Sequence, residues 1–120
     1  MRADGAPAPV GPYSQAVVCG DLVFCSGQLG LDPATGAMAE GAVAQARQAL
    51  ANLQAVLQAA GSSLDRAIKV TVYMTDLSRF PEVNGAYADF FEPPFPARTA
   101  IQVAALPKGG EVEIDVIALR

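Results

Sequence analysis

The residues best able to do chemistry in this chain are one arginine and two acids. Arg98 lies in an apolar stretch, 95–103, that has the composition of a strand. A guanidinium keeps its charge and donates hydrogen bonds in a planar fork, which suits a carboxylate ligand. Glu113 and Asp115 follow in a second such stretch after a short Pro-Gly turn, so we expect the two strands to lie close together. The sequence therefore predicts either a structural ion pair or a general base beside a ligand-binding cation.

The absence of histidine removes several mechanisms. The chain contains no histidine and two cysteines. A Ser-His-Asp triad, a Cys-His dyad and a His-ligated metal are therefore excluded, and two cysteines are too few for a structural zinc site. The chain contains neither a G-x-x-x-x-G-K-[ST] phosphate loop nor G-x-G-x-x-G. What remains is a site of arginine, carboxylate, hydroxyl, amide and backbone groups.

The final expected strand, 111–119, alternates in a way that bears on the two acids. Glu113, Asp115 and Ile117 share one face, and aliphatic residues share the other. A polar face in solvent is the simplest interpretation. However, Ile117 and Leu119 continue the acidic face as apolar residues, which indicates that this face is partly covered.

Four further residues offer polar or open positions near the expected strands and helices. Tyr13 lies in a Gly-Pro-Tyr-Ser-Gln segment, Ser26 and Gly27 lie in Ser-Gly-Gln, and Asn84 lies in the second expected helix. Each has an ordinary explanation, Tyr13 as a packing residue and Asn84 as an exposed amide. Taken singly, these residues do not distinguish structure from function.

These residues must be positioned by a few helices and strands in the order β-β-α-β-α-β-β. The clearest helix is expected at 41–60, where apolar residues recur every three or four positions. The remaining elements are two short strands at 13–18 and 22–26, a strand at 68–75, a helix at 79–91, and the two strands at 95–103 and 111–119.

This order predicts an α+β fold in which two helices pack on one face of a mixed sheet. The other face of such a sheet would be bare. The chain is 52% hydrophobic and only 17% charged, so we expect an oligomer that covers this face.

Length and charge set the remaining bounds. The 120 residues suit one domain, 1–120. A net charge of −4 and only two lysines argue against a nucleic-acid partner. There is no apolar stretch of membrane-spanning length and no signal-peptide pattern at the start, so we expect no membrane partner and a location in the cytoplasm.

The cysteines are not expected to form a disulfide. A hairpin around Gly20-Asp21 would set Cys19 opposite Leu22 and Cys25 opposite Ala16. The two thiols would then not face each other, and both are expected to be small buried hydrophobes.

Together the motifs resemble the RidA (YjgF) family. The similarity extends from about Ala6 to Arg120 in order and with suitable spacing. The segments that carry it are Gly11-Pro12-Tyr13-Ser14-Gln15, Ser26-Gly27-Gln28, Gln45-Ala46-Arg47-Gln48-Ala49-Leu50, Phe95-Pro96-Ala97-Arg98, and Leu106-Pro107 followed by Val112-Glu113-Ile114-Asp115.

The resemblance implies a chorismate-mutase-like fold and a homotrimer with ligand sites in clefts between subunits. It also implies hydrolysis of reactive enamines and imines, typically 2-iminopropanoate and 2-iminobutanoate, to 2-oxo acids and ammonia, without a cofactor or metal. On this resemblance, Arg98 would bind the substrate carboxylate in a bidentate way, and Glu113 would hold or activate the attacking water. Tyr13, Ser26, Gly27 and Asn84 would line the cleft. Of these, Tyr13 would belong to the catalytic residues, whereas Ser26, Gly27 and Asn84 would bind the substrate together with Arg98.

Three features of the sequence depart from the pattern of the family. Asp115 stands where the family more often has glutamate, Ala100 where well-known members carry cysteine, and the connection at 92–94 is shorter than in some relatives.

Two alternative functions are left open. One alternative function is a trimeric, non-catalytic module that binds small carboxylates. The other is an RNA-cleaving translation inhibitor, which the charge of −4 and the missing histidine disfavour.

Overall fold

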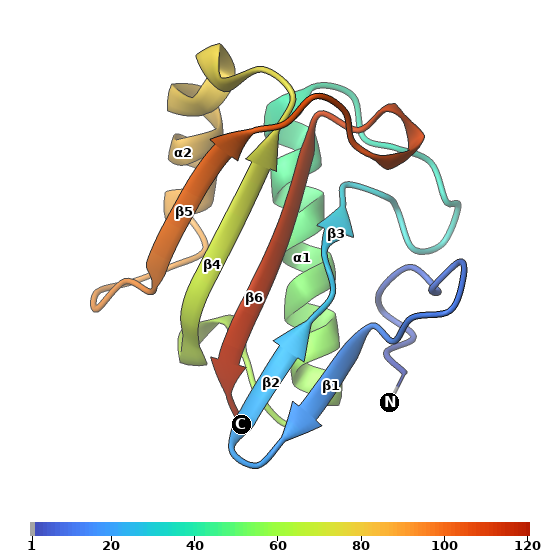
Figure 1. The fold of residues 1–120 in the computed structure, drawn as a ribbon, viewed down its shortest axis with the longest axis vertical. Coiled ribbons are helices and arrows are strands. Elements are labelled where there is room, and N and C mark those ends of the chain that lie inside the picture. The colour runs from blue at the N-terminus through green and yellow to red at the C-terminus, as the bar shows by residue number, and fades with distance from the viewer. Residues whose placement is uncertain (1) are drawn as a thin grey trace.

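In the computed structural model, which describes residues 2–120, the strands form one mixed sheet with the order β1-β2-β6-β4-β5, and β3 pairs with β6 beside this path (Figure 1). All pairings are antiparallel except that of β4 with β5, which is parallel. The strands are β1 (Ala16–Cys19), β2 (Leu22–Cys25), β3 (Gln28–Leu29), β4 (Ala67–Met74), β5 (Ala97–Gln102) and β6 (Val112–Leu119).

Two helices cover one face of this sheet, as the order of elements predicted. Helix α1 (Ala42–Ala59) lies along the sheet, and α2 (Phe80–Ala88) connects β4 to the parallel strand β5. A right-handed crossover of this kind is the usual way to join parallel neighbours. The predicted α+β class and the two helices on one face are therefore confirmed.

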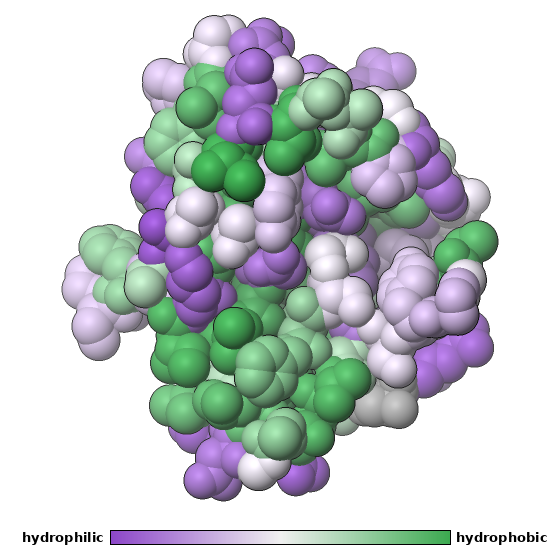
Figure 2. All heavy atoms as spheres, viewed as in Figure 1, coloured by the Kyte–Doolittle hydropathy of each residue, from purple (hydrophilic) through white to green (hydrophobic). Residues whose placement is uncertain are grey.

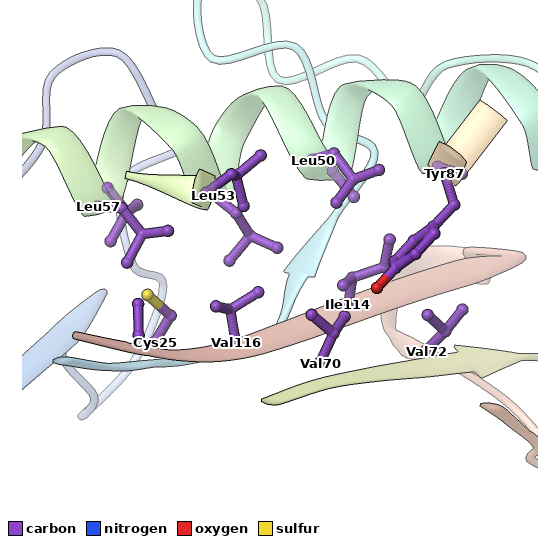
Figure 3. Close-up of a cluster of buried hydrophobic side chains, with 14 of the residues drawn as sticks. Cys25, Leu50, Leu53, Leu57, Val70, Val72, Tyr87, Ile114 and Val116 are labelled. Atoms are coloured by element: carbon purple, nitrogen blue, oxygen red, sulfur yellow. The ribbon is translucent and has the colours of Figure 1, made fainter. Parts of the chain in front are cut away.

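The core lies between α1 and the two central strands. Leu50, Leu53 and Leu57 of α1 have 0% exposure and point at the sheet (Figure 3). Ile114 and Val116 of β6 meet them from below, also at 0% exposure. Full burial of one such side chain stabilises the fold by about 1.5–3 kcal/mol, so this seam fixes α1 on the sheet.

The opposite face of the sheet carries no helix. Figure 2 looks onto this open face and shows an apolar area over β1, β2 and the end of β6. Val17 is 56% exposed, Phe24 42% and Leu119 40%. The bare face expected from the sequence is thus present, and it is apolar at one end.

The structure differs from the sequence-based expectations in the bounds of some elements and in the burial of one cysteine. Strand β3 was not expected. Helix α2 is shorter than the predicted 79–91, because residue 79 belongs to a preceding 3-10 turn (Leu77–Arg79) and the helix ends in a turn after Ala88. The hairpin pairs Ala16 with Cys25, as predicted, and Cys25 is buried. Cys19 is exposed, so its predicted burial is wrong.

The chain start is held beside β1 by the side chain of Gln15. Gln15 accepts a hydrogen bond from the Ala3 nitrogen at 2.7 Å and donates to the Pro7 carbonyl at 2.8 Å. This buried amide therefore fixes the segment between Ala3 and Pro7 next to the residue that precedes β1.

Within residues 2–120, no helix is long and apolar enough to span a bilayer.

Candidate active site

Arg98 is held by side chains of α2. It lies in register with Val70 of β4 and so points to the helical side of the sheet. Its Nη1 donates to Asn84 Oδ1 at 2.7 Å, and its Cζ lies 5.1 Å from the Phe80 ring centroid and 4.8 Å from that of Tyr87. Among residues 2–120, no carboxylate lies within ion-pair distance of this guanidinium. The arginine is oriented by an amide and two rings, and its charge is left available for an anion.

A hollow of about 310 Å³ opens beside this arginine. Its wall is largely apolar, with Arg98 and Asn84 as the polar groups. Such a hollow suits a small ligand with one carboxylate and an apolar remainder. The residues around it are Asn84, Tyr87, Ala88, Phe95, Pro96 and Arg98.

Tyr87 supports Arg98 through its ring. The ring stacks on Phe91 at 4.5 Å between centroids. The Tyr87 hydroxyl lies among the buried core side chains (Figure 3) and has no hydrogen-bond partner in the described part of the chain. Burial raises the pKa of Tyr87, and the nearby charge of Arg98 partly opposes this. The phenol therefore stays neutral and serves as a surface for the guanidinium.

Glu113 lies on the other face of the sheet. It is a half-buried residue of β6, paired with Tyr73 of β4 and Leu29 of β3. Burial, and to a smaller extent the charge of Asp115, raises the pKa of Glu113. A carboxylate of raised pKa is a better general base near neutral pH.

Gly27 leaves the space that Glu113 occupies. A Cβ at position 27 would lie 2.9 Å from Glu113 Cδ and 3.0 Å from its Oε1, closer than such contacts occur. Any side chain at this position would therefore displace the carboxylate. Glycine at position 27 therefore allows the Glu113 carboxylate to keep this position.

Glu113 opens into a second hollow, of about 410 Å³. Tyr13, Ser26 and Gly27 line it with Glu113, and Lys108 stands among its walls. The Ser26 hydroxyl donates to the Ser14 carbonyl at 2.6 Å, so this side chain also ties the wall of the hollow together.

The predicted site residues therefore form two clusters in one chain. Tyr13, Ser26, Gly27 and Glu113 surround one hollow, whereas Asn84 and Arg98 belong to the other. Strand β4 lies between β5 and β6, and the two clusters point to opposite faces. The expectation that the strands of Arg98 and Glu113 lie together is wrong, and no ion pair joins these residues within the chain.

The sequence reasoning missed Phe80 and Tyr87 as partners of Arg98. A signal was present, because these residues stand four before and three after Asn84, which places all three on one side of a helix. Within residues 2–120, no three side chains of histidine, cysteine, aspartate or glutamate gather as a metal ligand set.

Comparison with known proteins covers nearly the whole chain. A family model described as Endoribonuclease L-PSP matches residues 3–120. A RutC family protein of Sinorhizobium fredii is 53% identical over 118 residues, which are 98% of this chain and 94% of that protein. A 2-iminobutanoate/2-iminopropanoate deaminase of Bos taurus is 51% identical over 116 residues, 96% of this chain and 85% of that protein. The crystal structure of RidA from an Antarctic Psychrobacter superposes with a TM-score of 0.97 at 50% identity, covering 100% of this chain and 98% of that one.

Proposed function

The chain belongs to the RidA (YjgF) family, and on this premise we propose that it is a 2-iminobutanoate/2-iminopropanoate deaminase. The substrate is a short 2-imino acid, and the products are the 2-oxo acid and ammonia. The observation that carries the proposal is Arg98, a cation with no carboxylate partner in the described chain, held by an amide and two rings beside a small apolar hollow.

Arg98 supplies substrate binding. Its fork is suited to receive the carboxylate of the imino acid through two hydrogen bonds, and the hydrogen bond to Asn84 limits how the fork can turn. The apolar wall near Phe95 then receives the methyl or ethyl group of the substrate. A lysine would keep the charge and lose the fork.

Glu113 supplies the base. In the hydrolysis, the oxygen of a water molecule bonds to the imine carbon while a proton of that water passes to Glu113. The C=N bond becomes a single bond, and Glu113 returns its proton to the nitrogen. Ammonia then leaves as the C–N bond breaks, while the proton of the new hydroxyl passes to Glu113 and the carbonyl forms. A protonated imine is already electrophilic, so orientation and a base are sufficient contributions.

The separation of Arg98 from Glu113 leads us to place the complete site between two copies of the chain. Each copy would present its Arg98 cluster to the Glu113 cluster of a neighbour, and three copies would close a ring with identical contacts. The exposed apolar end of the open sheet face supports burial in such a homotrimer.

This activity removes a reactive metabolite, so we propose a role in metabolite damage control. The cytoplasm remains the location that we expect, since enzymes that use pyridoxal phosphate and release such imines would have to be close by. The single core cluster supports treating 1–120 as one domain.

A trapping assay tests the activity. A dehydratase acting on serine generates 2-iminopropanoate, semicarbazide traps it, and the purified protein should lower the trapped fraction. Arg98→Ala and Arg98→Lys should both lose this effect, because neither restores the fork. Arg66→Lys, on the exposed 3-10 turn before β4, is the matched control and should behave like the wild type.

The same assay separates the alternatives. If the wild-type protein left the trapped fraction unchanged at micromolar concentration, a non-catalytic module that binds small carboxylates would explain Arg98 better. If Arg98→Ala cleared the imine at the wild-type rate, the proposed mechanism would be wrong.

A further inference from the structure

The open face beside Glu113 carries a second acid that the proposed reaction does not use. Asp115 is two residues further along β6 and points to the same face, roughly 7 Å along the strand. The Tyr73 hydroxyl donates to Asp115 Oδ2 at 2.9 Å. Tyr73 is also the register partner of Glu113, so its ring lies beside one acid and its hydroxyl reaches the other.

No cation neutralises Asp115 within the described chain. The ion pairs among residues 2–120 involve Asp89 and Glu82 and not this carboxylate. Lys69, on the same face of β4, donates instead to Thr99 Oγ1 at 2.6 Å. Among the described residues, the Asp115 carboxylate therefore accepts a side-chain hydrogen bond only from the neutral hydroxyl of Tyr73.

Several other groups surround Glu113. Tyr73 faces it from β4, and β3 contributes only an apolar neighbour, Leu29. Tyr13 and Lys108 line the hollow into which Glu113 opens. In the proposed assembly, Arg98 of a second copy would also face Glu113, and this contribution would be the same in every variant that keeps Arg98.

We propose that Asp115 is a positioning residue for the proposed deaminase, whose negative charge strengthens Glu113 as a base, while the hydrogen bond from Tyr73 holds the Asp115 carboxylate in place. This inference rests on the proposed function, in which Glu113 accepts a proton from water. It assigns a role to a pair that neither binds the substrate nor touches the reacting atoms.

The electrostatics agree with this geometry. Burial raises the pKa of Glu113 first, and the charge of Asp115 raises it further. The hydrogen bond to Asp115 is the main cause that raises the pKa of Tyr73, as expected for a phenol that stays protonated and donates.

A purely structural role would be small here. Strands β4 and β6 already pair from Ala67 to Met74 through their backbones, so one side-chain hydrogen bond adds little to their alignment. The pair is also only half-buried. The arrangement is better explained by its effect on the neighbouring acid.

Carboxyl titration by NMR tests the inference without relying on turnover. The chain has five glutamates, so protein labelled with ¹³C-glutamate gives few carboxyl signals, and the signal lost in Glu113→Gln identifies Glu113. In Asp115→Asn, we expect the Glu113 midpoint to move down by roughly half a pH unit, because one nearby negative charge is gone. Asp115→Glu restores the charge and should return the midpoint toward the wild-type value.

Tyr73→Phe gives the opposite test. It removes the hydrogen bond to Asp115 and keeps the negative charge of that carboxylate, so the Glu113 midpoint should stay at or above the wild-type value. Asp65→Asn, at the other end of β4 from Tyr73, removes one distant negative charge and should change nothing. The inference is overturned if Asp115→Asn leaves the midpoint unchanged, or if Tyr73→Phe lowers it equally.

The acid limb of kcat/KM then links titration to chemistry. The pH at which this limb falls should follow the Glu113 midpoint in each variant. We expect it to move to lower pH in Asp115→Asn and not in the other variants. If the NMR midpoints shift as expected while Glu113→Gln still hydrolyses the imine, the coupling of the two acids stands and the proposed base is wrong. If the protein is a deaminase whose Glu113 titrates independently of Asp115, only this inference fails.

Discussion

At the scale of single residues, the arrangement around Arg98 explains how an exposed arginine can act as a fixed binding group. A free arginine side chain loses considerable rotational entropy when it binds a ligand. Asn84 accepts from one end of the guanidinium, and Phe80 and Tyr87 flank it, so part of this entropy is already lost in the folded chain. Binding of a carboxylate by Arg98, as proposed for the substrate, would then be less costly.

Asn84 should accordingly affect substrate binding more than turnover. In Asn84→Ala, the guanidinium loses one hydrogen-bond acceptor, worth about 1 kcal/mol, so we expect KM to rise roughly fivefold with kcat little changed. Steady-state kinetics with the trapping assay measure this. Glu82→Gln, on the same helix and paired only with Arg79, is the control. A fall in kcat at constant KM would instead place Asn84 in the chemical step.

The two cysteines should differ sharply in reactivity. Burial raises the pKa of Cys25 to about 12, with a smaller contribution from Asp115, so almost none of it is thiolate at pH 8. In Cys19→Ser, where Cys25 is the remaining thiol, we expect no reaction with Ellman's reagent until the chain is unfolded. Rapid labelling of the folded variant would show that the β1–β2 hairpin opens readily.

At the scale of elements, the segment after β3 depends on a close approach to α1. A Cβ at Gly30 would lie 2.5 Å from Gln45 Cα and 2.7 Å from its carbonyl oxygen. The approach lets Gln45 donate to the Ala39 carbonyl at 3.0 Å and accept from the Glu111 nitrogen at 2.7 Å. One buried side chain of α1 thus joins two loops at one end of the sheet.

Gly30→Ala and Gly85→Ala form a matched pair for this contact. At Gly30 the backbone itself must move, so we expect a loss of at least about 1–3 kcal/mol in the free energy of unfolding. A Cβ at Gly85 in α2 meets nothing within 4 Å, so alanine there should stabilise by roughly 0.5–1 kcal/mol. Chemical denaturation measures both. Equal effects at the two positions would contradict the close packing of Gly30.

The elements themselves were largely predictable, because long periodic patterns report which face is buried. The expected helix at 41–60 is observed as Ala42–Ala59, and the expected strand at 111–119 as Val112–Leu119. Strand β3 has only two residues, Gln28–Leu29, which is too short for any period to be visible.

The order of the strands was not predictable from local pattern. The short turn after β5 led us to expect β5 and β6 close together, but the α2 crossover places β5 parallel to β4 at the edge of the sheet. Strand β6 then occupies the other side of β4. Such choices depend on contacts between distant segments, so the candidate residues were identified while their division into two clusters was not.

At the scale of the whole molecule, this division is the strongest argument that one chain holds an incomplete site. Two hollows on opposite faces carry the cation and the base separately. Strand β5 has no buried residue on either face and lies at the sheet edge, so it is well placed to meet another copy. Under the proposed mechanism a complete site requires assembly, so dissociation should abolish turnover.

Mixing two inactive variants tests this arrangement directly. Arg98→Ala keeps the base and Glu113→Gln keeps the arginine, so neither alone should hydrolyse the imine. Suppose that each site combines Arg98 of one copy with Glu113 of its neighbour. Refolding the two variants together in equal amounts should then restore about one quarter of the wild-type sites. Two neighbouring copies can be combined in four equally frequent ordered ways, and only one of them supplies an intact Arg98 and an intact Glu113 to the same site. Refolding each variant alone controls for spontaneous recovery, and light scattering should give the mass of three chains throughout. Mixed trimers without activity would mean that both residues act from the same chain, through a rearrangement of the sheet that the present fold does not contain.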